Sequence, residues 1–237
     1  MQQNFRSPNR FLQSLSIADF ELLAPHLRTV ELKRSAVLFE TGGEIDRIYL
    51  PLNGAISLVV PLGGGEMVEA GMIGRDGIVG SPAALDSATA VNQAMVQVDG
   101  QASVVGVPAV QAAVRQSLSL RNAVYQYDQL LLIQAQQSAA CNAKHTVEER
   151  LSRWLLRSRD VLGSDFLPLT QEFVATMLGV RRTSVTLVAN RLKEAKLIKY
   201  RRGRVEILDL DGLQDSACEC YQALKNQESR MVGGNPL

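Results

Sequence analysis

The spacing of apolar residues changes twice along the chain and predicts three structural parts. Near the beginning, one amphipathic helix is expected over Leu15–Leu27, because apolar residues recur there at helical spacing: Ile17, Phe20, Leu23 and Leu27. Ser16 is placed to cap the N-terminus of this helix, with Asp19 three residues further on.

Between Val30 and about Val107 the apolar runs become short and turn residues separate them. The expected strands are Arg47–Leu50, Ala55–Val60, Met67–Met72, Ala94–Val98 and Ser103–Val107. Asn53-Gly54 and Gly63–Gly65 are predicted to be hairpin turns, because turns of this kind need residues with positive φ. Many short strands with frequent turns predict a β-sandwich or barrel.

A long helix is predicted over Leu118–Ala143, which contains neither Gly nor Pro. A three-four spacing runs along it, through the apolar Leu120, Val124, Tyr127 and Leu131 and then through Gln134, Ser138 and Cys141. Leu130, Leu132 and Ile133 extend the apolar surface beyond one face. The helix is therefore expected to pack on its own β domain and on a partner helix, although burial within one subunit would give the same pattern.

The last third of the chain predicts a winged helix-turn-helix. Thr146 begins a helix that ends near Gly163, and Leu167–Leu169 is an extended connector. Thr170 caps a two-turn helix that stops at Gly179, and a second helix starts at Arg181 with its inner face formed by Val185, Val188 and Leu192. Strands over Leu197–Tyr200 and Val205–Leu208 would form the wing, and a final helix is expected over Gly212–Asn226.

Composition changes this picture only when it is resolved along the chain. The 237 residues carry 25 Lys and Arg against 24 Asp and Glu, and this net charge of +1 argues against a polyanionic partner. However, Arg181–Arg204 holds nine Lys and Arg against the single Glu194, a local charge of +8. With no signal peptide, no membrane span and only three cysteines, a cytoplasmic protein without a membrane partner is expected.

The basic segment has the residue types that reading DNA requires. Arg binds guanine through two hydrogen bonds, whereas Ser and Thr hydroxyls and a helix N-terminus bind phosphates. The predicted DNA contacts are Thr170, Gln171, Arg181, Arg182, Thr183, Ser184, Thr186, Leu187, Asn190, Arg191, Arg201, Arg202 and Arg204.

The chain resembles the Crp/Fnr regulators in Gly71–Gly80, Leu169–Glu172, Leu178–Val185 and Leu192–Ile198. The resemblance implies an α+β fold: an N-terminal double-stranded β-helix (a β-roll like that of cyclic-nucleotide-binding proteins) in residues 1–117, a dimerisation helix in 118–144 and a winged helix-turn-helix in 145–237. It also implies a homodimer through Leu120, Val124, Tyr127 and Leu131, bound to palindromic double-stranded DNA and, if it activates, to RNA polymerase.

The resemblance also gives the contacts individual roles. Arg182, Thr183 and Leu187 fall where the family contacts bases, and Ser184 where it contacts a phosphate. Leu187 stands where the cyclic-AMP-dependent member of the family has a basic residue, and an apolar side chain meets a thymine methyl instead of reading guanine.

The effector is the part that the resemblance does not supply. Members that bind cyclic AMP use a Gly-Glu pair and an Arg-Ser pair, whereas the corresponding positions here are Gly80-Ser81 and Asn92-Gln93. Without the carboxylate and the Arg, a buried cyclic phosphate has no compensating charge, so cyclic AMP binding is not expected. The β-roll is predicted to sense an unidentified small molecule, or the regulator needs no effector.

No cofactor or metal is expected either. An iron–sulfur cluster needs about four cysteine ligands, and Cys141, Cys218 and Cys220 are too few and lie outside the N-terminal region. Haem would need His26 or His145, each a lone surface or helix-end histidine. Cys218 and Cys220 are too close in sequence for a zinc knuckle, and Cys141 is expected to be a small buried residue, with a redox role as the alternative.

Two other classes of function fit the sequence less well. An enzyme is not expected, because neither histidine lies in a nucleophile motif and Gly63–Glu66 lacks the Lys-Ser/Thr of a phosphate-binding loop. In an interaction module, the winged helix would bind protein and would show no salt-dependent affinity for DNA.

Overall fold

The structure is a computed structural model that describes residues 7–201 and 203–232, with the side chains of 230–232 left out. It begins with α1 (Arg10–Ser14), α2 (Ile17–Leu23) and the 3-10 helix η1 (Ala24–His26). Ser16 caps α2 as predicted, and its side chain accepts a hydrogen bond from the N–H of Asp19. The predicted extent of this helix to Leu27 is wrong, because Pro25 has no N–H to continue the α-helical pattern and the last turn tightens into η1.

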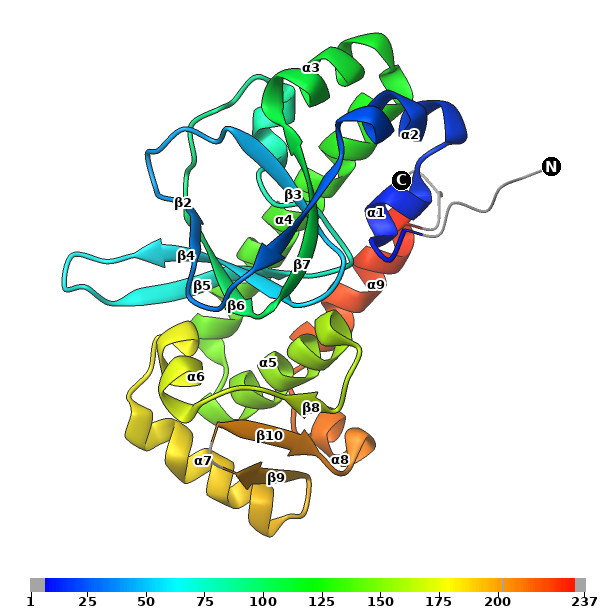
Figure 1. Cartoon of the computed structure of the whole chain (residues 1–237). Coiled ribbons are helices and arrows are strands. Elements are labelled where there is room, and N and C mark those ends of the chain that lie inside the picture. The colour runs from blue at the N-terminus through cyan, green and yellow to red at the C-terminus, as the bar shows by residue number, and fades with distance from the viewer. Residues whose placement is uncertain (1–6, 202, 233–237) are drawn as a thin grey trace.

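Two antiparallel sheets form the N-terminal domain (Figure 1). The first has the order β1 (Arg28–Leu32), β7 (Gly100–Gly106), β3 (Arg47–Pro51). The second has the order β2 (Val37–Phe39), β6 (Gln93–Val98), β4 (Ala55–Pro61), β5 (Met67–Ile73). The five strands expected from the sequence are confirmed within one to three residues at each end.

One of the two predicted hairpin turns joins strands of different sheets instead. Gly63–Gly65 connects β4 to its neighbour β5, as expected. Asn53-Gly54 carries the chain from β3, which pairs with β7, to β4, which pairs with β5 and β6, so it is not a hairpin. Gly54 does adopt the positive φ of 76°, and a Cβ there would lie 2.7 Å from the carbonyl oxygen of Val98. The glycine is needed for this close approach of two backbones.

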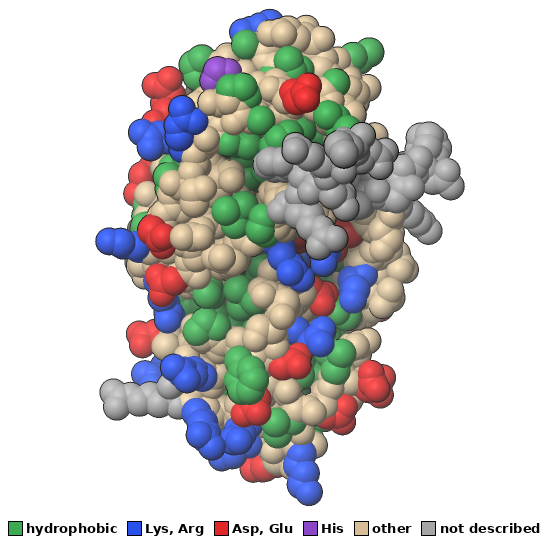
Figure 2. Space-filling view, turned by 45° about the vertical axis from the view of Figure 1, so that its right-hand side comes forward, with side chains coloured by type: hydrophobic (Ala, Val, Ile, Leu, Met, Phe, Trp, Pro, Cys, Tyr) green, Lys and Arg blue, Asp and Glu red, His purple; other side chains and the backbone are tan. Residues whose placement is uncertain are grey.

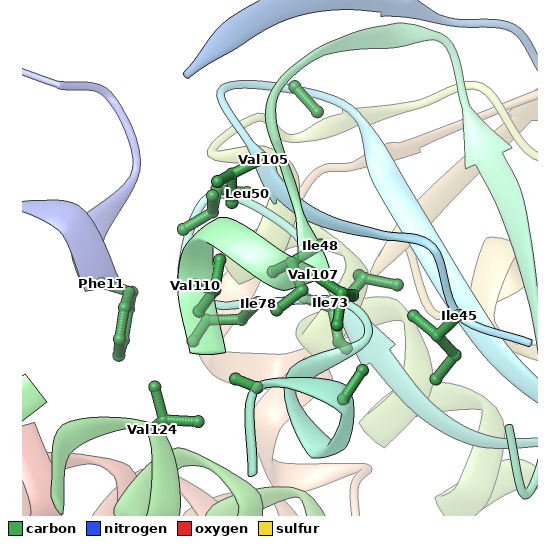
Figure 3. Close-up of a cluster of buried hydrophobic side chains, with 14 of the residues drawn as sticks. Phe11, Ile45, Ile48, Leu50, Ile73, Ile78, Val105, Val107, Val110 and Val124 are labelled. Atoms are coloured by element: carbon green, nitrogen blue, oxygen red, sulfur yellow. The ribbon is translucent and has the colours of Figure 1, made fainter. Parts of the chain in front are cut away.

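Helices close one side of the β domain. They are the 3-10 helix η2 (Ser81–Leu85), α3 (Val107–Gln116) and the long α4 (Leu118–Lys144), which confirms the predicted long helix. Figure 3 shows how the core forms between them: Phe11 of α1, Val110 of α3 and Val124 of α4 approach the strand residues Ile48, Leu50 and Val105.

The face of α4 that was expected to form a dimer packs on this core. Leu120 and Val124 are almost completely buried within the chain, Tyr127 packs edge-on against the ring of Phe11, and Leu131 lies against the same cluster. Leu120 and Val124 are therefore covered by the chain's own β domain and do not lie at the surface, whereas a dimer contact through the half-buried Tyr127 and Leu131 stays a prediction. Apolar side chains on other faces of α4 are exposed instead: Leu118, Tyr125 and Leu132.

The winged helix follows α4 directly. It consists of α5 (Val147–Leu162), β8 (Phe166–Leu167), α6 (Gln171–Leu178), α7 (Arg182–Glu194), β9 (Ile198–Arg201) and β10 (Arg204–Ile207). Thr146 and Glu149 form the predicted capping box of α5, and Gly163 ends that helix with a φ of 66°. Part of the connector expected at Leu167–Leu169 is in fact strand β8, which pairs with β10.

The predicted helix over Gly212–Asn226 is wrong, since the chain forms α8 (Leu210–Asp215) and α9 (Cys220–Val232) with a break between them. The hydroxyl of Ser216 donates back to the carbonyl of Gly212, and the N–H of Ala217 donates to Gln214, which ends α8 in a tight turn. After this break, α9 packs along α4 and α5.

The winged helix and the β domain share a second buried core. Ala55, Val59 and Met72 of the β4–β5 pair lie in one cluster with Leu151 and Trp154 of α5. Among the described residues, no helix has both the length and the apolarity needed to cross a membrane.

Candidate nucleic-acid interface

Helices α6 and α7 are held together by their turn and by one side-chain contact. Gly179 ends α6 with a φ of 61°, and α7 starts three residues later. The hydroxyl of Thr186 donates to Oε1 of Gln171 at 2.8 Å, and this bond connects the two helices near the surface. Thr170 caps α6, with its side chain accepting from the N–H of Phe173. The helix-turn-helix predicted from the sequence is thus present.

The outer face of α7 has the composition of a surface that reads DNA. Its buried residues are Val185, Val188, Ala189 and Leu192. The exposed residues include Arg181, Arg182, Thr183, Leu187 and Asn190, with Ser184 and Thr186 partly exposed. Leu187 is 55% exposed and is surrounded on this face by polar side chains.

The N-terminus of α7 is open to an anion. Arg181 occupies the cap position, and no side chain accepts a hydrogen bond from the first turn. The unpaired N–H groups and the positive end of the helix dipole favour a phosphate at this point.

The wing, formed by β9 and β10, lies beside α7 (Figure 1). Tyr200 of β9 donates from its hydroxyl to the carbonyl of Leu169 at 3.2 Å, which fixes the wing to the segment before α6. Arg201 and Arg204 are exposed at its end. Arg202, also predicted to contact DNA, lies outside the described residues.

Several basic side chains are free to neutralise a ligand. Within the described part of the chain, Arg181, Arg182, Arg201 and Arg204 form no ion pair, whereas Arg191 pairs with Glu148 at 3.4 Å and Lys199 with Glu206 at 3.4 Å. Figure 2 shows Lys and Arg side chains at the lower end of the molecule, where the winged helix lies, with Asp and Glu side chains among them. The local excess of positive charge found in the sequence is therefore a surface feature of this domain.

A polar network joins the β domain to the winged helix, and no pattern in the sequence indicated it. Nε1 of Trp154 in α5 donates to Glu69 of β5 at 2.8 Å, and the hydroxyl of Ser57 donates to the same carboxylate at 2.6 Å. Arg157 of α5 binds Asp76 at 2.7 Å and Glu228 of α9 at 3.0 Å. We call these residues, Ser57, Glu69, Asp76, Trp154, Arg157 and Glu228, the interdomain network.

Charge and burial shift the pKa values of two carboxylates of this network in opposite directions. Burial raises the pKa of Glu69 to about 7, although the hydrogen bonds from Ser57 and Trp154 oppose the shift. Burial would also raise the pKa of Asp76, but the charge of Arg157 and the hydrogen bond from the Gly74 N–H outweigh it, and the pKa is lowered. Arg157 is correspondingly held in its charged form, with a raised pKa.

A cavity of about 300 Å³ lies between the β domain and α4. Gly80, Ser81 and Asn92, three of the four residues predicted for an effector pocket, line this cavity. Gln93 does not, because its amide donates to Glu40 at 2.7 Å. The rest of the lining is mostly apolar and includes Leu58, Leu131 and Leu132.

The only charged side chain among the described residues that line this cavity is Asp128. Burial raises the pKa of Asp128, while the hydrogen bond donated by Ser81 opposes the shift. A carboxyl group and an apolar wall suit an uncharged or cationic small molecule better than a phosphate.

Cys141 is buried as expected, but the sequence did not indicate that the three cysteines and His145 lie together. His26 is exposed beside α2. His145, Cys141, Cys218 and Cys220 come together at the end of α4. They do so although 77 residue positions separate Cys141 from Cys218 and 75 separate His145 from Cys220.

The C-terminal part of the chain matches a known protein family. Residues 149–216 match the family described as the Crp-like helix-turn-helix domain. Among curated protein sequences, none matches the chain.

Three solved structures illustrate the likeness of the whole fold. FixK2 from Bradyrhizobium japonicum has a TM-score of 0.71 at 13% identity, over 81% of this chain and 98% of that one. A CRP/FNR-family transcriptional regulator from Thermus thermophilus has a TM-score of 0.66 at 22% identity, over 80% and 98%. The c-di-GMP-responsive global regulator CLP from Xanthomonas campestris has a TM-score of 0.66 at 17% identity, over 81% and 99%. Residues 149–216 are therefore a Crp-like helix-turn-helix domain, and the chain as a whole has the fold of the Crp/Fnr transcription regulators.

Proposed function

We propose that this protein is a homodimeric transcription regulator that binds a palindromic operator through α7. The observation that carries the proposal is the exposed face of α7, where Arg182, Thr183, Leu187 and Asn190 lie together. Among the described residues, none forms an ion pair with Arg182. An α-helix with such a face fits the major groove of B-DNA, and the free arginines of the wing fit the backbone beside it.

The proposed dimer contact is an exposed stripe along α4. Leu118, Tyr125, Leu132 and Ala139 are all exposed and lie seven residues apart. A repeat of seven keeps such residues on one side of a helix that pairs with a second helix. The opposite side of α4 is held by the chain's own core, so this stripe leaves α4 able to serve the β domain and a second copy together.

The effector in this proposal is not a cyclic nucleotide. The Xanthomonas relative responds to c-di-GMP, whereas the cavity beside α4 offers Asp128 and, among its described lining residues, no Lys or Arg. A phosphodiester there would face a carboxyl group and would lack a cationic partner. A small apolar or cationic ligand is favoured, and it would touch Leu131 and Leu132 of α4 directly.

The route from this cavity to DNA runs through α4 and the interdomain network. Gln134 of α4 accepts a hydrogen bond from the N–H of Met72 at 3.0 Å, and the carbonyl of Met72 accepts one from Arg157 of α5 at 3.0 Å. A ligand that prefers one position of α4 would therefore bias the position of α5 and the winged helix. The size of that bias equals the difference in the ligand's affinity for the two positions.

Variants of one arginine in each part of the interface test the proposal. An operator is first selected from a random DNA pool with the wild-type protein. Arg182→Ala is expected to lower affinity for that operator by about 10- to 100-fold while leaving weak non-specific binding, because one bidentate base contact provides about 1–3 kcal/mol of discrimination. Arg204→Ala is expected to weaken binding to all sequences alike and to reduce the slope of log affinity against log salt by about one.

Arg115→Ala is the matched control, since Arg115 is exposed on α3, in the N-terminal domain. Selection of no sequence, or equal effects of Arg182→Ala and Arg115→Ala, would contradict DNA reading by α7. Affinity for DNA that does not depend on salt would favour the alternative, a winged helix that binds protein.

A further inference from the structure

Three cysteines and one histidine converge where the long helix meets the winged helix. Cys141 lies in the last turn of α4, His145 caps that helix, and Cys218 and Cys220 lie in the segment that leads from α8 into α9. All three cysteines are buried and none forms a disulfide. Their sulfur atoms and a ring nitrogen of His145 all lie within 4.8 Å of one another.

Two of the six distances between these atoms are close to the edges of a small tetrahedron, and the rest are no longer than 4.8 Å. Sγ of Cys141 and Sγ of Cys218 are 3.5 Å apart, and Sγ of Cys220 lies 3.6 Å from Nδ1 of His145. In a tetrahedral zinc site, bond lengths of about 2.3 Å to sulfur and about 2.0 Å to nitrogen place two sulfurs about 3.8 Å apart and a sulfur and a nitrogen about 3.5 Å apart. We propose that Cys141, His145, Cys218 and Cys220 bind one zinc ion as a closed, four-ligand structural site.

The groups around the four ligands are those that a metal site needs in its second layer. Nε2 of His145 lies 3.3 Å from a carboxylate oxygen of Glu219, which fixes the ring so that Nδ1 faces the sulfurs. Nε2 of Gln137 donates to Sγ of Cys220 at 2.9 Å. A hydrogen bond of this kind stabilises a thiolate more than a neutral thiol.

The charge of the site is balanced by buried arginines. Three thiolates, a neutral histidine and Zn²⁺ carry a net charge of −1. Arg150 and Arg153 of α5 are both buried, and neither forms an ion pair with another described residue. Burial raises the pKa of Cys141, and the nearby charge of Arg153 opposes the shift. Burial lowers the pKa of Arg150, and a thiolate at Cys141 would oppose that shift. Both arginines therefore lie near enough to Cys141 to interact with it electrostatically, and Arg153 also acts on Glu69.

Other uses of the same residues fit less well. A four-iron cluster binds each ligand to a different iron and needs its ligand atoms further apart than ligands that share one ion. A disulfide between Cys141 and Cys218 would use only two of the four side chains that converge here.

A zinc ion at this position would join parts of the fold that are far apart in the sequence. It would fasten the start of α9 to the end of α4, at the point where the chain turns into α5. Arg150, which faces the site, also donates to the carbonyl of Leu178, the last residue of α6. The site therefore lies directly behind the helix-turn-helix and would hold it in place relative to α4.

The test begins with the full-length protein, purified without chelators from cells grown with added zinc. Elemental analysis and native mass spectrometry are expected to find one zinc per chain, bound to protein with three reduced cysteines. Exchange into Co²⁺ is expected to give the strong visible absorption and the sulfur-to-cobalt charge-transfer bands of a tetrahedral thiolate site. Removal of the metal by a chelator is expected to lower Tm by about 5–10 °C, and added zinc should restore it.

Single substitutions then assign the ligands. Cys218→Ser and His145→Gln are expected to lower zinc affinity by at least about 100-fold, with His26→Gln as the matched control that binds like the wild type. Glu219→Gln is expected to weaken zinc binding about tenfold. Because a cysteine variant can fail to fold, the cobalt spectrum of the wild-type protein decides independently. Protein that contains no zinc and rejects Co²⁺, a disulfide, or iron with sulfide would each overturn the proposal.

Discussion

Leu187 is the one large apolar side chain on the exposed face of α7 that the structure describes. Its neighbours on that face, Arg182, Thr183 and Asn190, have hydrogen-bonding groups that match base edges or phosphates. An exposed leucine offers only apolar contact, and in the major groove the methyl group of thymine is the feature that rewards it. We infer that Leu187 contributes a preference for thymine at one position of each half-site.

Leu187→Arg is expected to replace that preference with one for guanine, because a guanidinium group donates two hydrogen bonds to guanine. The change should favour the new base by about 1–3 kcal/mol at that position and leave the others unaltered. In vitro selection from a random DNA pool measures this directly. Leu62→Arg, which adds the same charge on the exposed β4–β5 turn, should return the wild-type sequence. An unchanged selected sequence for Leu187→Arg would remove Leu187 from the base contacts.

Two glycines of the winged helix have a positive φ, but only one of them also lies against another element. Gly179, in the turn between α6 and α7, combines a φ of 61° with a close approach to β5, since a Cβ there would lie 2.9 Å from Cγ2 of Val68. Gly203, in the wing, has a φ of 74°, but a Cβ added there would have no described atom within 4 Å. A side chain at Gly203 would therefore add backbone strain alone, whereas a side chain at Gly179 would add strain and a collision with β5.

Gly203→Ala is expected to lower stability by about 1 kcal/mol, the strain of a left-handed alanine. Gly179→Ala should lower it by about 2 kcal/mol or more, because the collision with Val68 adds to the same strain. Chemical denaturation of both variants compares the two values, and adding Val68→Ala should recover part of the difference. Equal losses at the two glycines would show that β5 does not press on the turn.

The exposed stripe of α4 makes a prediction about self-association. Leu132→Arg is expected to raise the dimer dissociation constant at least tenfold, which corresponds to about 1.4 kcal/mol, because it places like charges opposite each other across the contact. Analytical ultracentrifugation measures the effect. Ile17→Arg, at a residue that is 66% exposed on α2, serves as the control. A dimer of unchanged strength in Leu132→Arg would rule out the stripe.

At the scale of the whole molecule, the interdomain network links domain docking to pH. The folded protein holds a proton on Glu69 up to a pKa of about 7, whereas an unfolded chain releases it near the ordinary value of 4.5. The folded state therefore binds more protons between these values, and its stability falls as pH rises from about 5 to 7. Arg153 and Arg157 face the same carboxylate and limit the effect.

Glu69→Gln keeps an oxygen for the hydrogen bond from Trp154 but has no proton to release. Between about pH 5 and about pH 8, the free energy of unfolding of Glu69→Gln should therefore fall by about 1–2 kcal/mol less than that of the wild type. Urea denaturation at several pH values tests this, with Glu66→Gln on the exposed β4–β5 turn as control. Identical pH profiles for Glu69→Gln and the wild type would show that Glu69 does not titrate in this range.

Local patterns in the sequence predicted the elements, and they failed where distant residues decide the outcome. The capping residues Ser16, Thr146 and Thr170 and the end of α6 at Gly179 were correct, because each depends on neighbours within one turn. The three-four pattern of α4 coincides with the face that packs on the chain's own core, because such a pattern marks a buried face without saying what buries it. The opposite face of α4 is marked by exposed residues seven positions apart, namely Leu118, Tyr125, Leu132 and Ala139.

The cluster of Cys141, His145, Cys218 and Cys220 also depends on residues that are distant in the sequence. Cys218 and Cys220 alone have a spacing that is unlike that of zinc knuckles. Their partners Cys141 and His145 come from another helix, and a break between α8 and α9 that the pattern did not indicate brings them together. The four residues could have been considered jointly, since they hold every cysteine of the chain and one of its two histidines.

Because α4 is one uninterrupted helix of 27 residues, the angle between its core-facing side and its exposed stripe is fixed. Inserting a single residue midway would turn everything beyond it by about 100°, which moves Gln134 away from Met72 and brings the stripe out of line at the same time. Inserting seven would restore the phase but push the winged helix about 10 Å further along the axis. The distance and the angle between the β domain and the winged helix therefore both depend on α4, and in the proposed dimer any insertion there would change the spacing at which two copies meet DNA.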